Sequence, residues 1–164
     1  MVFSERKSIS LGLYLALLVF ACIIYVTPIP GAPNIRIDAI ALLILYVNFY
    51  RPVAWPLSLG FCTGLLQDLV AFAPLGQHAL GLVFICFMAP WFRDSLRMLP
   101  PLKQLPLIIF MLLFLKFLSG WVTALNLGIL PNINAIWAVL LTSIFWPMLI
   151  GLFESSPKIR RVAS

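Results

Sequence analysis

The stretch GFCTGLLQDLVAFAPLGQHALG, residues 60–81, places an acidic side chain inside an apolar segment. Gly60, Gly64 and Asp68 recur every four residues, so a helix carries them on one face. Small residues at this spacing let a second helix approach closely, and an ionisable group in hydrocarbon is costly. We therefore expect Gly60 and Gly64 to be helix-packing residues, and Asp68 to point into protein rather than lipid.

The next feature is the break that follows this helix. Pro74 and Gly76 interrupt the helical pattern and predict a tight connection to a second, antiparallel helix. His78, the only histidine of the chain, then falls in the first turn of that helix. Free backbone amides and the helix dipole favour a carboxylate at a helix N-terminus. Asp68 is therefore expected to accept hydrogen bonds from these amides, from His78, or from both.

The composition indicates a membrane protein. Hydrophobic residues make up 63% of the 164 residues, and charged residues only 10%. A soluble domain of this length cannot bury so much apolar surface. The net charge of +6 fits basic residues held on the cytoplasmic side of a membrane better than binding to nucleic acid. The three cysteines lack metal-ligand spacing, so neither a metal nor a cofactor is expected.

Apolar segments of membrane-spanning character recur along the whole chain. A helix that crosses the hydrocarbon needs about 20 residues. The predicted spans are Ile9–Thr27, Ile37–Tyr50, Ala54–Phe72, Gly76–Phe92, Leu105–Asn126 and Ile133–Phe153. A polar stretch, RDSLRMLPPLKQLP, separates the fourth span from the fifth. Residues 1–164 are thus expected to form one all-α transmembrane domain of six helices.

Basic residues predict the orientation of these spans. Nine of the 11 lysines and arginines lie before the first span, after the last, or in the connections after the second and fourth. Arg36 lies on the opposite side, and Lys116 falls inside the fifth span. This asymmetry places both termini in the cytoplasm. The apolar N-terminal segment is expected to be a retained anchor rather than a cleaved signal peptide.

A second polar group begins the second span, in the sequence NIRID. Asn34 is a candidate N-cap, Asp38 lies in or near the first turn, and Arg36 can reach the outer headgroups. Asp38, Asp68 and His78 are expected at similar depth, with Arg36 as the nearest cation. These four residues predict either a polar pocket open to the outer face or a set of structural hydrogen bonds between helices.

Lys116 is predicted to lie near the middle of the membrane. It follows Lys103 by 13 residues, which corresponds to about 17–20 Å along a helix. A structural or snorkelling role is expected, because no acidic residue is predicted at that depth to form an ion pathway. Enzymatic activity is not expected either. Walker, HExxH and GxSxG motifs are missing, and no nucleophile motif accompanies Asp68 and His78.

Several segments resemble the rod shape-determining protein MreD family of bacteria. They are the pattern of Gly60, Gly64 and Asp68 followed by PLGQHAL, the segment RIDAIALLILYVNFYRP, and FWPMLIGLF before a basic tail. Ile37 stands where the family frequently has proline. The resemblance covers essentially the whole chain.

The resemblance implies a non-enzymatic scaffold subunit of the cell-elongation machinery in the bacterial cytoplasmic membrane. Its implied partners are MreC and membrane lipids, and indirectly MreB filaments and the RodA glycosyltransferase with its partner transpeptidase. It also implies a fold similar to the S components of energy-coupling-factor transporters. The alternative function is therefore an S-component-like protein that binds or transports a small molecule or lipid through the outer polar pocket. We favour the scaffold.

Overall fold

The computed structural model describes residues 10–27, 36–51, 53–128 and 134–154, and within these ranges every regular element is an α-helix. The helices are α1 (Leu11–Val26), α2 (Ala39–Tyr50), α3 (Pro56–Ala71), α4 (Gln77–Met98), α5 (Pro101–Leu127) and α6 (Asn134–Glu154). α4, α5 and α6 contain apolar stretches long enough to cross a membrane, whereas α1, α2 and α3 are shorter apolar helices. The predicted all-α class and six apolar helices are therefore confirmed for the part of the chain described.

Local sequence explains where several helices begin and end. Ser10 precedes α1, and its Oγ accepts a hydrogen bond from the Leu13 amide at 3.4 Å. α3 and α5 begin at Pro56 and Pro101, where the missing N–H of proline costs nothing. α5 ends before Gly128, which adopts the left-handed conformation with φ of 65°.

The region between α4 and α5 differs from the prediction. α4 continues past Phe92 to Met98, and α5 begins at Pro101 rather than at Leu105. Most of the polar stretch RDSLRMLPPLKQLP is therefore helical rather than a connection, and only Leu99 and Pro100 separate the two helices. The polar residues show where the apolar part of α4 ends, but the helix continues beyond them to Met98.

Two arginines on the extra turns of α4 give a physical reason for this extension. Arg93 donates from Nε to the Asn48 carbonyl at 2.9 Å, and Arg97 donates from Nε to the Phe49 carbonyl at 2.5 Å. These carbonyls lie in the last turn of α2, where backbone acceptors have no partner within the helix. Cations also favour the C-terminal end of a helix dipole. The continued α4 therefore stabilises the end of α2.

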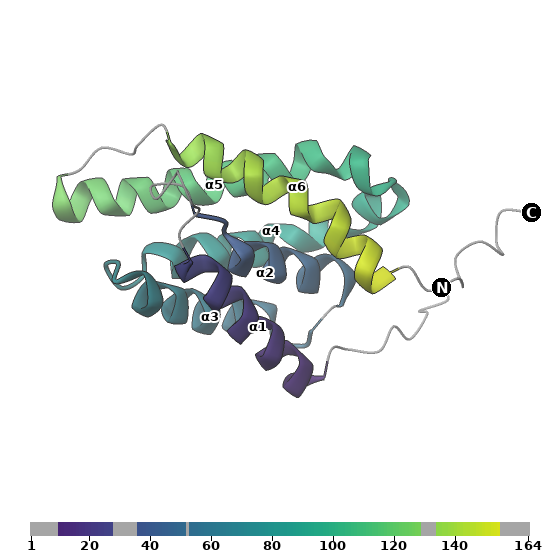
Figure 1. Cartoon of the computed structure of the whole chain (residues 1–164), viewed down its shortest axis with the longest axis horizontal. Helices are drawn as coiled ribbons and strands as arrows, with labels where there is room; N and C mark the ends of the chain where they lie inside the picture. The colour runs from purple at the N-terminus through teal and green to yellow at the C-terminus, as the bar shows by residue number, and fades with distance from the viewer. Residues whose placement is uncertain (1–9, 28–35, 52, 129–133, 155–164) are drawn as a thin grey trace, which may run out of the picture.

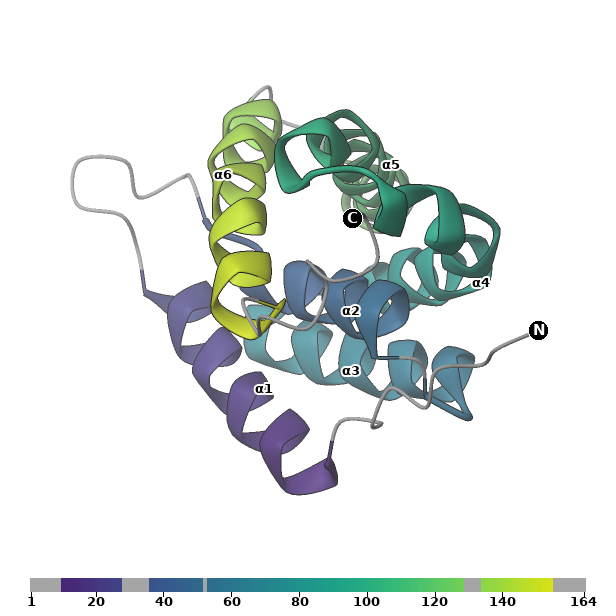
Figure 2. The same cartoon turned by 90° about the vertical axis from the view of Figure 1, so that its right-hand side faces the viewer.

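α2 is the central helix of the bundle. Every residue from Ile40 to Tyr50 is buried, and Figure 2 shows α2 in the middle of the other helices. α2 packs against α4 and α1, and to a smaller extent against α6 and α3. Its 12 residues extend over about 18 Å, which is less than the hydrocarbon thickness of about 30 Å. Neighbouring helices therefore enclose this short helix.

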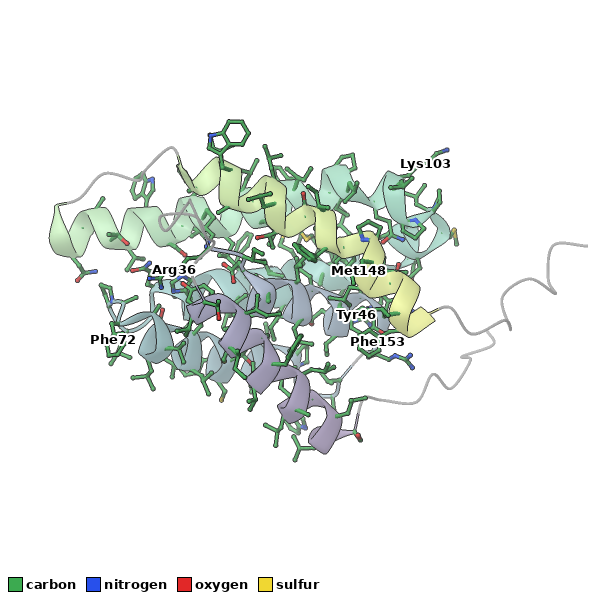
Figure 3. The ribbon with its side chains drawn as sticks, in the orientation of Figure 1. Arg36, Tyr46, Phe72, Lys103, Met148 and Phe153 are labelled. Atoms are coloured by element: carbon green, nitrogen blue, oxygen red, sulfur yellow. The ribbon has the colours of Figure 1, made fainter. Side chains whose placement is uncertain are left out.

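The remaining helices form two hairpins and one outlying helix. α3 and α4 pack along each other most extensively, α5 packs against α4 and α6, and α1 lies against α2 and α3. Figure 1 shows one end of α5 extending beyond the other helices. In Figure 3, Arg36 and Phe72 lie at one end of the bundle, and Lys103 and Phe153 at the other. We call these the outer and the inner end, following the orientation expected from the basic residues.

Gln104 holds the inner end together. Its side-chain oxygen accepts hydrogen bonds from Tyr50 Oη at 3.0 Å and from Trp146 Nε1 at 2.9 Å. Its side-chain nitrogen donates to the Leu99 carbonyl at 2.8 Å. Gln104 is only 1% exposed, so these bonds join α2, α5, α6 and the α4–α5 connection away from water.

Candidate functional site

The glycines of α3 face the backbone of α4. A Cβ atom added at Gly64 would lie 2.7 Å from the Ala79 amide nitrogen. A Cβ atom added at Gly60 would lie 2.6 Å from Cys86 Sγ and 3.1 Å from the Leu82 carbonyl oxygen. At Gly64 the two backbones thus approach too closely for any side chain, and at Gly60 a side chain would press on the Cys86 thiol and on the backbone of α4. This close approach is the use of small residues in membrane helix pairs.

Asp68 is fully buried on the same face of α3 and binds the start of α4. Its Oδ1 accepts hydrogen bonds from the backbone amide and from Nδ1 of His78, both at 2.8 Å. Its Oδ2 accepts from the Gly76 amide at 2.8 Å. A carboxylate only accepts, so His78 carries a proton on Nδ1. Asp68 therefore acts as the side-chain cap of α4, although it belongs to α3.

The connection between α3 and α4 brings these groups together. Phe72 ends α3 in the left-handed conformation with φ of 52°, and Gly76 follows with φ of 95°. The Gln77 amide donates to the Pro74 carbonyl at 3.1 Å. Gly76 is the N-cap residue of α4 and has no side chain to accept from its amides, so the carboxylate of α3 takes that place.

Asp38 forms the second centre of polar contacts, at the N-cap of α2. Its Oδ1 accepts from Gln67 Nε2 at 2.9 Å and from the Ala41 amide at 3.3 Å. Its Oδ2 accepts from Lys116 Nζ at 2.7 Å, and its own amide donates to Thr142 Oγ1 at 3.0 Å. Asp38 therefore connects α2 to α3, α5 and α6 through one side chain and one amide.

These contacts correct two expectations. Lys116, and not Arg36, is the cation paired with Asp38, so the prediction that no acidic residue shares the depth of Lys116 is wrong. Arg36 is exposed before the start of α2. The reason is that the side chain of Asp38 is directed toward α3 and α5, where Gln67 and Lys116 bind it. Asn34, the predicted N-cap, lies outside the described residues, and Asp38 itself is the cap.

The two centres are close to each other. Gln67, which binds Asp38, precedes Asp68 in α3, and the ring of Tyr25 in α1 stands edge-on to the His78 ring with centroids 6.4 Å apart. We refer to the whole set as the polar cluster: Tyr25, Asp38, Gln67, Asp68, His78, Lys116 and Thr142. All six helices contribute to it.

The sequence does not identify four members of the polar cluster. Tyr25, Gln67 and Thr142 are common residue types in apolar segments, and the sequence predicts no partner for Lys116. The available signal was the position of Gln67 beside Asp68 on the face of the glycines. Nothing comparable points to Thr142, because α6 is apolar on all sides.

The polar cluster has the geometry of a contact that holds helices together. The side chain of Asp38 is 3% exposed and that of Lys116 is 20% exposed. A buried ion pair offsets its desolvation only when further hydrogen bonds satisfy the charged groups, and Asp38 has such bonds from Gln67 and Ala41. Within the described residues, no group of three or more histidine, cysteine or acidic side chains could hold a metal ion.

The apolar helices and their buried polar cluster define a multi-pass membrane protein that is held together by contacts between its own helices. The chain matches the family described as rod shape-determining protein MreD over residues 5–156. This covers most of the sequence, and the chain belongs to that family. It is therefore a non-enzymatic, multi-pass protein of the bacterial cytoplasmic membrane with a role in determining rod shape. No curated protein and no solved structure matched.

Proposed function

We propose that this chain is a scaffold subunit of the bacterial cell-elongation complex. It binds MreC and helps couple MreB filaments to peptidoglycan synthesis by RodA and its partner transpeptidase. The family match over residues 5–156 carries this proposal. We further propose that residues 1–164 form a single domain with six membrane spans and with both termini in the cytoplasm.

The contacts of the polar cluster favour a scaffold over a ligand-binding protein. The oxygens of Asp38 and Asp68 accept hydrogen bonds from protein donors on neighbouring helices. A ligand in an outer pocket would have to replace these partners, and each replacement disrupts a contact between helices. Bonds of this kind fix the relative positions of the helices, which is what a subunit needs to present a constant surface to a partner.

The distribution of charge supports the proposed orientation. Figure 3 shows Lys103 toward the inner end and Arg36 toward the outer end. Arg51 bonds to the carbonyl of Phe153 at the inner end, and Arg93 and Arg97 bond to the last turn of α2 beside it. Cytoplasmic connections carry the excess of lysine and arginine in membrane proteins. The inner end is therefore the cytoplasmic one in our proposal.

Purification of the tagged chain in mild detergent tests the scaffold function. We expect MreC to co-purify at a constant ratio, and the Asp68→Leu variant to lose MreC in proportion to its loss of folded protein. The Asp94→Asn variant, altered at an exposed residue of α4, is the matched control and should retain MreC. Recovery of a well-folded chain without MreC, but with a tightly held small molecule, would support the alternative function instead.

Cysteine labelling tests the orientation separately. Single cysteines at Leu75 and Met98, which are 70% and 86% exposed, report on opposite ends of the bundle in a background without Cys22, Cys62 and Cys86. Only the cysteine at position 75 should react with an impermeant thiol reagent in cells with a permeabilised outer membrane. Reaction at position 98 alone would reverse the proposed orientation.

A further inference from the structure

The helices on one side of the bundle are shorter than those on the other side. Figure 2 shows α1 and α3 on one side of the central α2, and α5 and α6 on the other. α1 and α3 have 16 residues each, which corresponds to about 24 Å of helix. The apolar stretches of α5 and α6, Pro101–Asn126 and Ala135–Phe153, have 26 and 19 residues, or about 39 and 28 Å. We call the exposed surface of α1 and α3 the short side.

Non-helical backbone limits the thickness of hydrocarbon that α3 can cross. Trp55, before the helix, and Phe72, after it, both depart from helical geometry. Irregular backbone that is exposed to lipid does not occur within the hydrocarbon region, because no water is present there to bind its polar groups. Trp55 and Phe72 are 76% and 98% exposed, so they lie at the two boundaries of the hydrocarbon beside α3. Tilting of α3 from the membrane normal would bring these boundaries still closer together.

The exposed surface of α3 is apolar between these two boundaries. Leu57, Phe61, Leu66 and Leu69 are 38–65% exposed, and they lie on the side of the helix that faces away from the glycines. Ser58, near the start of the helix, is the only exposed polar residue of α3. Acyl chains can therefore cover α3 over its whole length, but not beyond it.

The contact between α3 and α4 shows at which end α3 is short. A Cβ atom added at Gly60 would lie 2.6 Å from Cys86 Sγ of α4. The two helices are antiparallel, so Pro56, one turn before Gly60, lies beside the turn of α4 that follows Cys86. α4 then continues to Met98, so the start of α3 lies about 12 Å short of the inner end of α4.

Exposed tryptophans indicate the same inner boundary on both helices. Trp55 directly precedes α3, and Trp91 lies five residues after Cys86 on α4. They are 76% and 67% exposed. Tryptophan is enriched at the interface between headgroups and acyl chains. Together, Trp55 and Trp91 place the inner boundary beside the start of α3 rather than beside the end of α4.

We propose that the short side binds phospholipids with short acyl chains and thereby holds a locally thin bilayer, whereas the side formed by α5 and α6 contacts bilayer of ordinary thickness. The hydrocarbon core is about 30 Å thick, which exceeds the length of α3 by about 6 Å. A bilayer adapts to a short helix by thinning, and short acyl chains reduce the cost of that adaptation. The inference goes beyond the scaffold function, because it gives the protein a preferred lipid on one side.

Fluorescence quenching by lipid, measured separately on the two sides of the bundle, tests this proposal. Cys62, exposed near the middle of α3, is labelled with bimane in the full-length chain with Cys22 and Cys86 replaced by alanine. Leu113→Cys, near the middle of α5 and 39% exposed, is labelled in a chain without the three native cysteines. The vesicles contain brominated dioleoylphosphatidylcholine as the quencher. They also contain an unbrominated competitor, either dimyristoleoyl- or dierucoylphosphatidylcholine.

The two labels should rank the competitors differently. At position 62 the shorter lipid should displace the quencher about twofold more effectively than the longer lipid. At position 113 the longer lipid should be at least as effective as the shorter one. Phe61→Cys and Phe110→Cys, 49% and 63% exposed, provide a second pair of positions on the same two helices.

Three results would overturn the proposal. The first is the same ratio of displacement on both sides, and the second is a preference for the longer lipid at position 62. The third is a label at position 62 that brominated lipid does not quench, which would show that a second copy of the chain covers the short side. None of these results bears on the co-purification of MreC, which tests the scaffold function separately.

Discussion

Replacing Asp68 with leucine removes the acceptor of three hydrogen bonds at the start of α4. Two of the donors belong to His78 and bind Oδ1, and the third is the Gly76 amide, which binds Oδ2. Asparagine keeps one oxygen, which can accept both bonds from His78. Its amide nitrogen would then face the Gly76 amide, donor against donor. We therefore expect stability to fall in the order aspartate, asparagine, leucine.

The sizes of the two effects follow from burial. A buried donor without a partner costs about 1–3 kcal/mol, and His78 is only 4% exposed. Leucine at position 68 leaves both donors of His78 and the Gly76 amide unpaired, and it removes a negative charge that is worth about 0.3–1 kcal/mol near a helix N-terminus. The free energy of unfolding should therefore fall by about 3–10 kcal/mol. Asparagine disturbs one bond, to a partly buried amide, and removes the same charge, so it should cost about 1–4 kcal/mol.

Unfolding of the purified protein by sodium dodecyl sulfate, followed by tryptophan fluorescence, measures these differences. Asp94→Asn and Asp94→Leu are the controls, because Asp94 is an exposed aspartate on α4. They should change the free energy of unfolding by no more than about 0.5 kcal/mol. If Asp68→Leu is as stable as the Asp94 variants, Asp68 does not hold the two helices together. If Asp68→Asn lowers the free energy of unfolding as much as Asp68→Leu does, then loss of the negative charge explains the destabilisation, and the number of lost hydrogen bonds does not.

Two further predictions use the same measurement. Gly64→Ala should destabilise the protein by about 1–3 kcal/mol, because the new Cβ meets the backbone of α4. Gly151→Ala is the control, because no atom lies within 4 Å of its added Cβ. It should raise the free energy of unfolding by up to about 1 kcal/mol, since alanine favours a helix more than glycine does. Changes of the same sign at both glycines would contradict the close approach of α3 and α4. Lys116→Met should cost about 3–5 kcal/mol, because it leaves the carboxylate of Asp38 buried without its counter-charge. Adding Asp38→Asn should recover more than half of that loss, and a double variant as unstable as the single one would show that the ion pair is not the cause.

Local spacing explains which parts of this structure can be predicted from sequence. Asp68 and His78 are ten residues apart, and the turn at Pro74 and Gly76 leaves few ways to arrange them. The pair of Asp38 and Lys116 spans 78 residues and depends on how α5 lies relative to α2. Soluble helices reveal their buried face by hydrophobic periodicity. Membrane helices such as α5 and α6 are apolar on all sides, so the sequence does not show which face meets which neighbour.

The end of α4 also depends on residues that are distant in the sequence. The polar residues after Phe92 end the apolar pattern, and the sequence therefore predicts that the fourth helix ends there. α4 nevertheless continues, because Arg93 and Arg97 find carbonyl partners on α2, 45 and 48 residues earlier in the chain. The likeness to the S components of energy-coupling-factor transporters stays a prediction.

The separation of Asp38 from Lys116 has a consequence for the order in which the protein assembles in the membrane. At a synthesis rate of about 5–20 residues per second, the lysine leaves the ribosome about 4–16 s after the aspartate. Until then Asp38, at the N-cap of α2, lacks its cation, and the cost of moving it into the hydrocarbon rises toward the value of about 2.5–3.5 kcal/mol for an acidic residue at the centre of an inserting helix. We expect the start of α2 to wait near the outer membrane surface while the α3–α4 hairpin closes behind it. The helix at the centre of the finished bundle would then be among the last to take its final position, once the arrival of α5 supplies the charge that holds it there.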